Sequence, residues 1–127
     1  MSTFPALVVR DDDPVPPYEQ LRRQLSDMIC FGVLAPGHRL PPLRQLAGDL
    51  GLALGTVART YRELEASGLI ASHRGAGTRV ANSRNQFTPE QMLDALARDT
   101  DDYVRRALMI GASPEQISDA INRSLRP

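Results

Sequence analysis

The stretch that decides the fold spans residues 43–69 and reads LRQLAGDLGLALGTVARTYRELEASGL. Apolar residues recur in its first part at i, i+3, i+4 and i+7, as Leu43, Leu46, Ala47 and Leu50. That spacing puts all four side chains on one face of an α-helix. Gly51 follows at once, and glycine tolerates the left-handed conformation in which many helices end. We therefore predict a short helix that ends at Gly51.

A second apolar row follows in the same stretch, at Val57, Tyr61 and Leu64. Ala47 falls where two helices that cross at a steep angle need a small side chain between them. Two short helices joined in this way form a helix-turn-helix. The second helix of such a pair can lie in the major groove of DNA, so the spacing bears on function as well as on fold.

The flanking residues extend this motif to a winged helix-turn-helix over residues 14–83. A preceding helix is predicted from near Tyr18 to Gly32, with a buried face made by Tyr18, Leu21, Leu25, Met28 and Ile29. Residues 38–40 can supply a very short strand. After Gly68, residues 69–73 and 78–81 enclose a glycine-rich tip at 74–77, which is the pattern of a β-hairpin.

Two segments lie outside this domain. Residues 1–13 are expected to form an extended or mobile N-terminal arm. Residues 88–126 are expected to form two helices, because TPEQ at 88–91 and SPEQ at 113–116 are capping boxes with proline at the first helical position. A helical hairpin of this size cannot bury its apolar faces alone, so it packs on the winged helix, on a second copy, or on both. The predicted fold class is mostly α with a small β-wing (α+β).

The charge balance is informative only when it is divided along the chain. The net charge is zero, but residues 14–85 hold nine arginines against five acidic residues, a net of +4. Residues 86–127 hold five arginines against seven acidic residues, a net of −2. The basic part coincides with the helix-turn-helix, as in a nucleic-acid binder. The absence of lysine does not indicate DNA binding, because the base composition of the genome explains it equally well.

The remaining composition argues against several other classes of protein. Cys30 is the only cysteine, which excludes an intramolecular disulfide, and no Cys/His cluster exists for zinc. No nucleophile–base pair or carboxylate dyad stands out, so we expect no enzyme, no cofactor and no metal site. No transmembrane stretch and no signal peptide is evident, which leads us to expect a cytoplasmic protein without a membrane partner.

The chain resembles the DNA-binding domain of GntR-family transcription regulators. The similarity is carried by PPYEQLRRQL at 16–25, GVLAPGHRLPPLRQLA at 32–47, TVARTYRELEASGLI at 56–70 and RGAGTRVA at 74–81. The wording of TVARTYRELE and the short helical tail resemble the YtrA subfamily, whose members have a brief C-terminal dimerisation region in place of a large effector domain.

The resemblance implies roles for individual residues. In the family, the arginine after L-P-x-x contacts the operator, and Arg44 matches it. Thr56 matches the threonine at the start of the recognition helix, where it can cap the helix or offer its hydroxyl and backbone N–H to phosphate. Arg59 matches a usually basic position. The wing motif matches Arg74, Gly75, Gly77 and Thr78, and the candidate DNA-binding set is completed by Gly55 and Arg62.

Two departures from the family pattern concern the same interface. Pro42 stands where the family commonly has a serine, which removes one phosphate contact. Ala53, Leu54 and Gly55 stand where polar residues are usual, so the entrance of the recognition helix offers fewer hydrogen bonds. Recognition of the bases is therefore expected to depend on apolar contact with thymine methyl groups, on Arg59 and on DNA shape.

We expect a homodimeric, sequence-specific DNA-binding regulator that represses transcription from a palindromic operator on double-stranded DNA. The alternative is a winged-helix module for protein interaction or dimerisation that binds no specific DNA. The expected dimer contacts are Leu96, Tyr103, Ala107, Ile110, Ile117 and Ile121. A small-molecule effector is conceivable at a pocket between the tail and the winged domain, around Tyr103 and Met109, although ordinary core packing explains these residues better.

Overall fold

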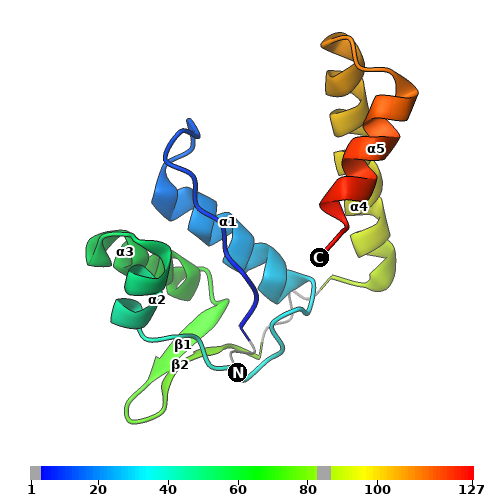
Figure 1. The fold of residues 1–127 in the computed structure, drawn as a ribbon. Helices are drawn as coiled ribbons and strands as arrows, with labels where there is room; N and C mark the ends of the chain where they lie inside the picture. Colours follow the sequence, from blue (N-terminus) through cyan, green and yellow to red (C-terminus); the bar gives the residue numbers. More distant parts are fainter. Residues whose placement is uncertain (1–3, 83–86) are drawn as a thin grey trace. The chain divides into compact units, whose positions relative to one another are not determined.

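A computed structural model describes residues 4–82 and 87–127 of the chain. It divides into two compact units, Met1–Phe87 and Thr88–Pro127. The first unit contains α1 (Pro17–Cys30), α2 (Leu43–Leu50), α3 (Leu54–Ala66), β1 (Ile70–His73) and β2 (Gly77–Val80), and the second contains α4 (Pro89–Met109) and α5 (Pro114–Ser124) (Figure 1). The predicted fold class is confirmed.

The helix-turn-helix is formed by α2 and α3. Gly51 ends α2 in the left-handed conformation, with φ 66°, and its N–H bonds back to the carbonyl of Gly48. Ala47 is buried in the hydrophobic core, and α2 packs on α3. The second row, Val57, Tyr61 and Leu64, is also buried. The second row therefore has the role that its spacing predicts, and in the first row Leu46 and Ala47 are buried while Leu43 and Leu50 are half-buried against the core.

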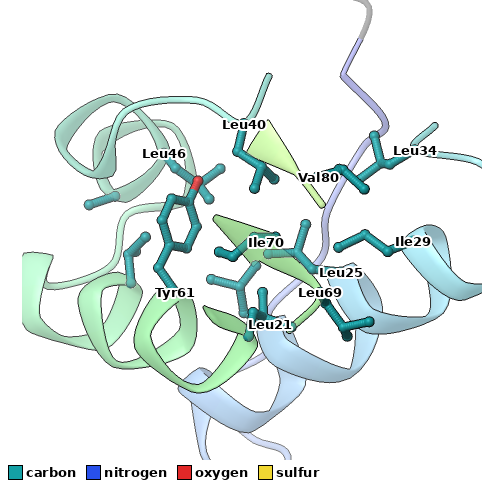
Figure 2. Packing of buried hydrophobic residues seen from close by; sticks show 13 residues of the cluster. Leu21, Leu25, Ile29, Leu34, Leu40, Leu46, Tyr61, Leu69, Ile70 and Val80 are labelled. Atoms are coloured by element: carbon teal, nitrogen blue, oxygen red, sulfur yellow. The ribbon is translucent and has the colours of Figure 1, made fainter. Parts of the chain in front are cut away.

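A single hydrophobic core contains residues of α1, α2 and α3, together with Ile70 and Val80 from the paired strands of the hairpin. Leu21, Leu25 and Ile29 of α1 point toward Ile70 and Val80 of the strands, with Tyr61 on the other side (Figure 2). Each of the three α1 residues is at most 1% exposed. Burying a leucine or isoleucine side chain contributes about 1.5–3 kcal/mol, so this row fixes α1 on the rest of the unit.

Two hydroxyl groups of α3 tie the helix to distant segments. Thr60, which is fully buried, donates from Oγ1 to the carbonyl of Tyr18 over 2.8 Å. The Tyr61 hydroxyl donates to the carbonyl of Pro41 over 2.7 Å, and burial raises the pKa of this phenol. Because a buried hydroxyl needs a partner, these bonds fix α3 against the start of α1 and against the segment before α2.

The β-hairpin follows α3 and projects from the helices as a wing (Figure 1). Its antiparallel register runs from Ile70 opposite Val80 to His73 opposite Gly77. Gly75 and Gly77 have φ of 81° and 73°, so the tip needs the backbone freedom of glycine. The very short strand expected at 38–40 is present as an isolated bridge between Arg39 and Arg79.

The N-terminal segment is extended and lies along α1. The side-chain amide of Gln24 exchanges two hydrogen bonds with the backbone of Val8, of 3.0 and 2.7 Å. Gln20 bonds in the same way with the backbone of Arg10, over 2.9 and 2.8 Å. Phe4, Leu7 and Val9 pack against the core. The sequence predicts an extended or mobile arm here. In the structure the segment is extended and packs as part of the first unit.

The second unit is a hairpin of α4 and α5. Both predicted capping boxes are present, with the hydroxyls of Thr88 and Ser113 accepting from the backbone N–H groups of Gln91 and Gln116 over 3.1 Å each. Gly111 has φ 90° in the turn between the helices. In the described part of the chain, no helix combines the length and apolar character needed to cross a membrane.

Candidate nucleic-acid interface

One face of α3 is directed away from the core. Gly55, Arg59 and Arg62 are exposed and recur at i, i+4 and i+7, which places them on a single side of the helix. The buried row of Val57, Tyr61 and Leu64 occupies the opposite side. Arg44 of α2 is also exposed. The helix-turn-helix therefore leaves three candidate arginines on its surface, each with a guanidinium group able to form two parallel hydrogen bonds.

The guanidinium of Arg59 contacts two other side chains of the same unit. Its Cζ lies 3.6 Å from the centroid of the Tyr18 ring, which is a cation–π contact with the first turn of α1. Its Nε lies 3.8 Å from a carboxylate oxygen of Glu63, one turn along α3. That separation exceeds hydrogen-bond distance, so the pair is a loose one. Half of the Arg59 side chain remains exposed, at 52%.

The entrance of α3 differs from the prediction made for Thr56. The N-cap residue is Ala53, and no side chain caps the helix. Thr56 is the third helical residue, and its N–H donates to the carbonyl of Ala53 over 3.1 Å. The expected capping role of Thr56 is therefore wrong, because the helix begins two residues earlier. The exposed main chain at this end belongs to Gly55, beside which a Cβ would meet no atom within 4 Å.

The wing offers Arg74 and Gly75, which are exposed at the turn. Thr78 is half-buried, and its hydroxyl lies 3.2 Å from that of Ser72 on the paired strand. Arg79, which also flanks the tip, donates from Nη1 to the carbonyl of Gly37 over 3.0 Å. The turn is therefore open to a ligand, as are the adjacent exposed residues Ser72 and His73 of β1.

Arg39 was not among the candidates that the sequence suggested. Its guanidinium covers Gly77, where a Cβ would lie 3.1–3.4 Å from three guanidinium atoms. The exposed Arg39 side chain thus adds a positive charge next to the wing. Residues 39 and 77 are far apart in sequence and meet because the segment 37–40 pairs with β2, so no local pattern signals the contact.

The six predicted dimer contacts fall into two groups. Ala107 and Ile117 are each 7% exposed and hold α4 against α5, so they leave almost no surface for another chain. The other four lie on the surface of the hairpin: Leu96 is 53% exposed, Tyr103 44%, Ile110 79% and Ile121 38%. Exposed apolar side chains gathered on a small unit are typical of an interaction surface.

A groove of about 390 Å³ runs between α4 and α5. It is lined by Tyr103, Arg106, Ala107, Ile110, Ala112, Gln116, Ile117 and Ala120. The sequence suggested a pocket around Tyr103 and Met109. Tyr103 lines this groove, whereas Met109 is 81% exposed and does not.

Comparisons with known proteins agree with this geometry. A family model described as "Bacterial regulatory proteins, gntR family" matches residues 17–80. The HTH-type transcriptional regulator Rv1152 of Mycobacterium tuberculosis is 41% identical over 96 residues, which are 76% of this chain and 74% of that protein. The HTH-type transcriptional repressor YtrA of Bacillus subtilis is 28% identical over 106 residues, 84% of this chain and 82% of that protein.

A solved structure described as AraR(DBD) in complex with operator ORX1 is also similar. Its TM-score is 0.53 at 28% sequence identity, and the match covers 61% of this chain and all of that one. The family model spans half of the chain, and the relative from Mycobacterium tuberculosis matches three quarters of it. The chain therefore belongs to the GntR family of bacterial regulatory proteins.

Proposed function

We propose that this chain is a transcriptional repressor that binds a palindromic DNA operator as a homodimer. The observation that carries the proposal is the outward face of α3, where Gly55, Arg59 and Arg62 lie in one row. A row of this kind fits the major groove, because α3 presents arginine forks to phosphates and guanine edges. AraR(DBD), a structure similar to this one, is described in complex with an operator, which supports the same use of the fold here.

The remaining candidate contacts surround this row. Arg44 precedes α3 on the neighbouring helix, and Arg74 and Gly75 lie at the tip of the wing. Phosphate contacts from such positions fix the register of a protein on the duplex, while contacts in the groove read its sequence. Gly77 and Thr78 support the shape of the wing in this proposal. Thr56 lies in the first turn of α3. It is proposed to offer its hydroxyl to a phosphate, without the capping role.

The homodimer is proposed to form through the unit Thr88–Pro127. Leu96 and Tyr103 of α4 and Ile110, the residue at its C-cap, recur at intervals of seven residues and are all more than two-fifths exposed. That interval aligns apolar side chains along one side of a helix, as in packing between paired helices. A two-fold dimer would place two copies of α3 about 34 Å apart, in successive major grooves of a palindrome.

Repression is proposed because YtrA of Bacillus subtilis, a relative over most of its length, is named a repressor. We propose that a small-molecule effector binds in the groove between α4 and α5, where Arg106 and Gln116 supply the polar groups and which Tyr103 and Ile110 share with the proposed dimer interface. We infer that the chain acts as a regulator and not as an enzyme.

The first experiment measures binding of the full chain to a duplex selected by the protein from a random library. Wild-type protein should bind with an affinity that falls steeply as salt rises, because phosphate contacts release counterions. Arg44→Ala should weaken binding by about 1–3 kcal/mol. Arg105→Ala, on the exposed surface of α4, is the control and should bind as the wild type does.

A result without salt dependence or sequence preference would instead favour the alternative, a winged-helix module for protein interaction. An unchanged affinity of the Arg44 variant would remove that residue from the interface while leaving the rest of the proposal in place.

A second experiment tests the dimer by sedimentation. Leu96→Asp puts a carboxylate on the proposed interface and should shift the protein toward monomer. Arg98→Asp introduces the same group two residues further, about 200° around the helix, and should leave the dimer intact. If both variants sediment as the wild type does, the contact lies elsewhere.

A further inference from the structure

We propose that Tyr18 is a positioning residue for DNA binding, because its ring holds the guanidinium of Arg59 in the orientation used on the operator. The inference rests on the proposed function. Its basis is the 3.6 Å separation between Arg59 Cζ and the centroid of the Tyr18 ring. The two residues belong to different helices and are brought together only by the packing of α1 on α3.

The backbone of Tyr18 has a fixed place relative to α3. The carbonyl of Tyr18 accepts the hydrogen bond from Thr60 Oγ1, 2.8 Å away. Thr60 is fully buried and directly follows Arg59 in the chain. Leu21, one turn after Tyr18, is also fully buried in the shared core. The start of α1 is therefore anchored next to the residue whose side chain it contacts.

Stacking on a ring suits an arginine that must bind DNA. A guanidinium that lies flat on a ring is engaged through its face, which leaves the N–H donors around its edge free to bond outward. These donors are the groups that a phosphate or a guanine edge would accept from. A side chain already held in place loses less conformational freedom on binding, so the ring favours the complex through preorganisation.

Glu63 also lies close to the guanidinium of Arg59, so the Tyr18 contact affects this ion pair as well. Its carboxylate attracts the same guanidinium but lies 3.8 Å from Nε, too far for a hydrogen bond. Stacking on Tyr18 thus opposes a tight pair with Glu63, which would occupy the N–H donors. In this proposal the ring keeps Arg59 available to DNA and the carboxylate competes for it.

The test is a double-mutant cycle on the full chain, with a duplex selected by the wild-type protein from a random library. Tyr18→Leu should weaken binding about fivefold, the equivalent of a cation–π contact of about 1 kcal/mol. Tyr18→Phe keeps the ring and should bind within about twofold of the wild type. In an Arg59→Ala background, Tyr18→Leu should have no further effect, because the group that the ring positions is gone.

A loss of stability must be separated from a loss of positioning. Thermal unfolding of each variant identifies any that fails to fold. Arg59→Lys gives an independent check, because it keeps the charge at an exposed position but lacks the planar group that stacks. It should bind more weakly than Tyr18→Leu, because it also lacks the bidentate fork, and adding Tyr18→Leu to it should change little.

Three outcomes would overturn the inference while the wild type still binds its duplex. They are additive effects of Tyr18→Leu and Arg59→Ala, a loss for Tyr18→Phe equal to that for Tyr18→Leu, and full affinity of folded Tyr18→Leu. Failure of the proposed function is distinguishable, because the wild-type protein itself would then show no sequence preference and no salt-dependent binding.

Discussion

Gly51 and Gly55 should respond in opposite ways to the same substitution, alanine. Gly51 has φ 66°, and a Cβ there would meet no atom within 4 Å, so the cost of Gly51→Ala is backbone strain alone. Strain in the left-handed region costs about 1–2 kcal/mol per residue. The stiffer unfolded chain offsets about 0.4–1 kcal/mol of this, which leaves a net loss of about 1 kcal/mol.

Gly55 lies in the first turn of α3 with an unstrained φ and equally open surroundings. Gly55→Ala should therefore raise the stability, by about 0.5 kcal/mol, since alanine favours helix over glycine. If the main chain at Gly55 approaches DNA, the added methyl group should also weaken operator binding, by about 1–3 kcal/mol as in an overpacked contact.

Calorimetric unfolding and fluorescence anisotropy with a labelled selected duplex measure the two effects. Gly51→Ala should lower the Tm by about 4–8 °C and leave the affinity unchanged, because a typical domain remains folded after losing 1 kcal/mol. Gly55→Ala should raise the Tm and weaken binding. A lower Tm for Gly55→Ala would refute the assignment of Gly55 to an unstrained helical position. Full affinity of that variant would refute the close approach of DNA.

Four further predictions follow from individual contacts. Glu63→Gln removes a carboxylate 3.8 Å from Arg59 and should tighten duplex binding at low salt, with the gain shrinking as salt rises; a gain independent of salt would speak against an electrostatic cause. Tyr61→Phe deletes the 2.7 Å bond to the Pro41 carbonyl and should cost about 1 kcal/mol, visible in calorimetry as a Tm drop of about 4–8 °C. Hydrogen bonds from Arg22, opposed by desolvation and reinforced by Arg23, lower the pKa of Glu19 from 4.5 to about 2. The charged carboxylate therefore stabilises the fold above pH 4.5, and this contribution disappears as the pH falls toward 2. Glu19→Gln should lower stability at pH 7 by no more than about 1 kcal/mol, because the pair is partly exposed, and the difference from the wild type should vanish near pH 2 in melts across that range. Arg39→Ala should weaken DNA binding and reduce the salt slope by about 1 without changing the Tm; an unaltered slope would mean that Arg39 contacts no phosphate.

The elements that the sequence predicts are those whose signals are local. The apolar row at Leu43, Leu46, Ala47 and Leu50, with Gly51 after it, specifies α2 because helical period and left-handed glycine act within a few residues. The capping boxes at Thr88 and Ser113 are local in the same sense, and both are formed. Exposure of Arg59 and Arg62 follows from the same period, since the buried row determines the opposite face.

Contacts across the fold could not be predicted in this way. The stacking of Arg59 on Tyr18, the cover that Arg39 gives to Gly77, and the bond from Thr60 to the Tyr18 carbonyl each join separate elements. Threonine and tyrosine at these positions are equally compatible with plain apolar packing. The start of α3 differs from the prediction for a related reason. Ala53 carries no capping group, so the sequence holds no marker of the first helical residue, and Thr56 was the nearest polar side chain.

The hydrogen bonds between α1 side chains and the backbone of the N-terminal segment have an evolutionary consequence. Gln20 and Gln24 bind main-chain atoms of residues 10 and 8, so the side chains at those two positions are free to change. Related chains can therefore diverge there while the path of the segment is preserved, as long as both glutamines persist and no proline removes a donating N–H. The matching family model begins only at residue 17. An equivalent N-terminal segment in a related chain is therefore better identified by the two glutamines of α1 than by sequence similarity within the segment itself.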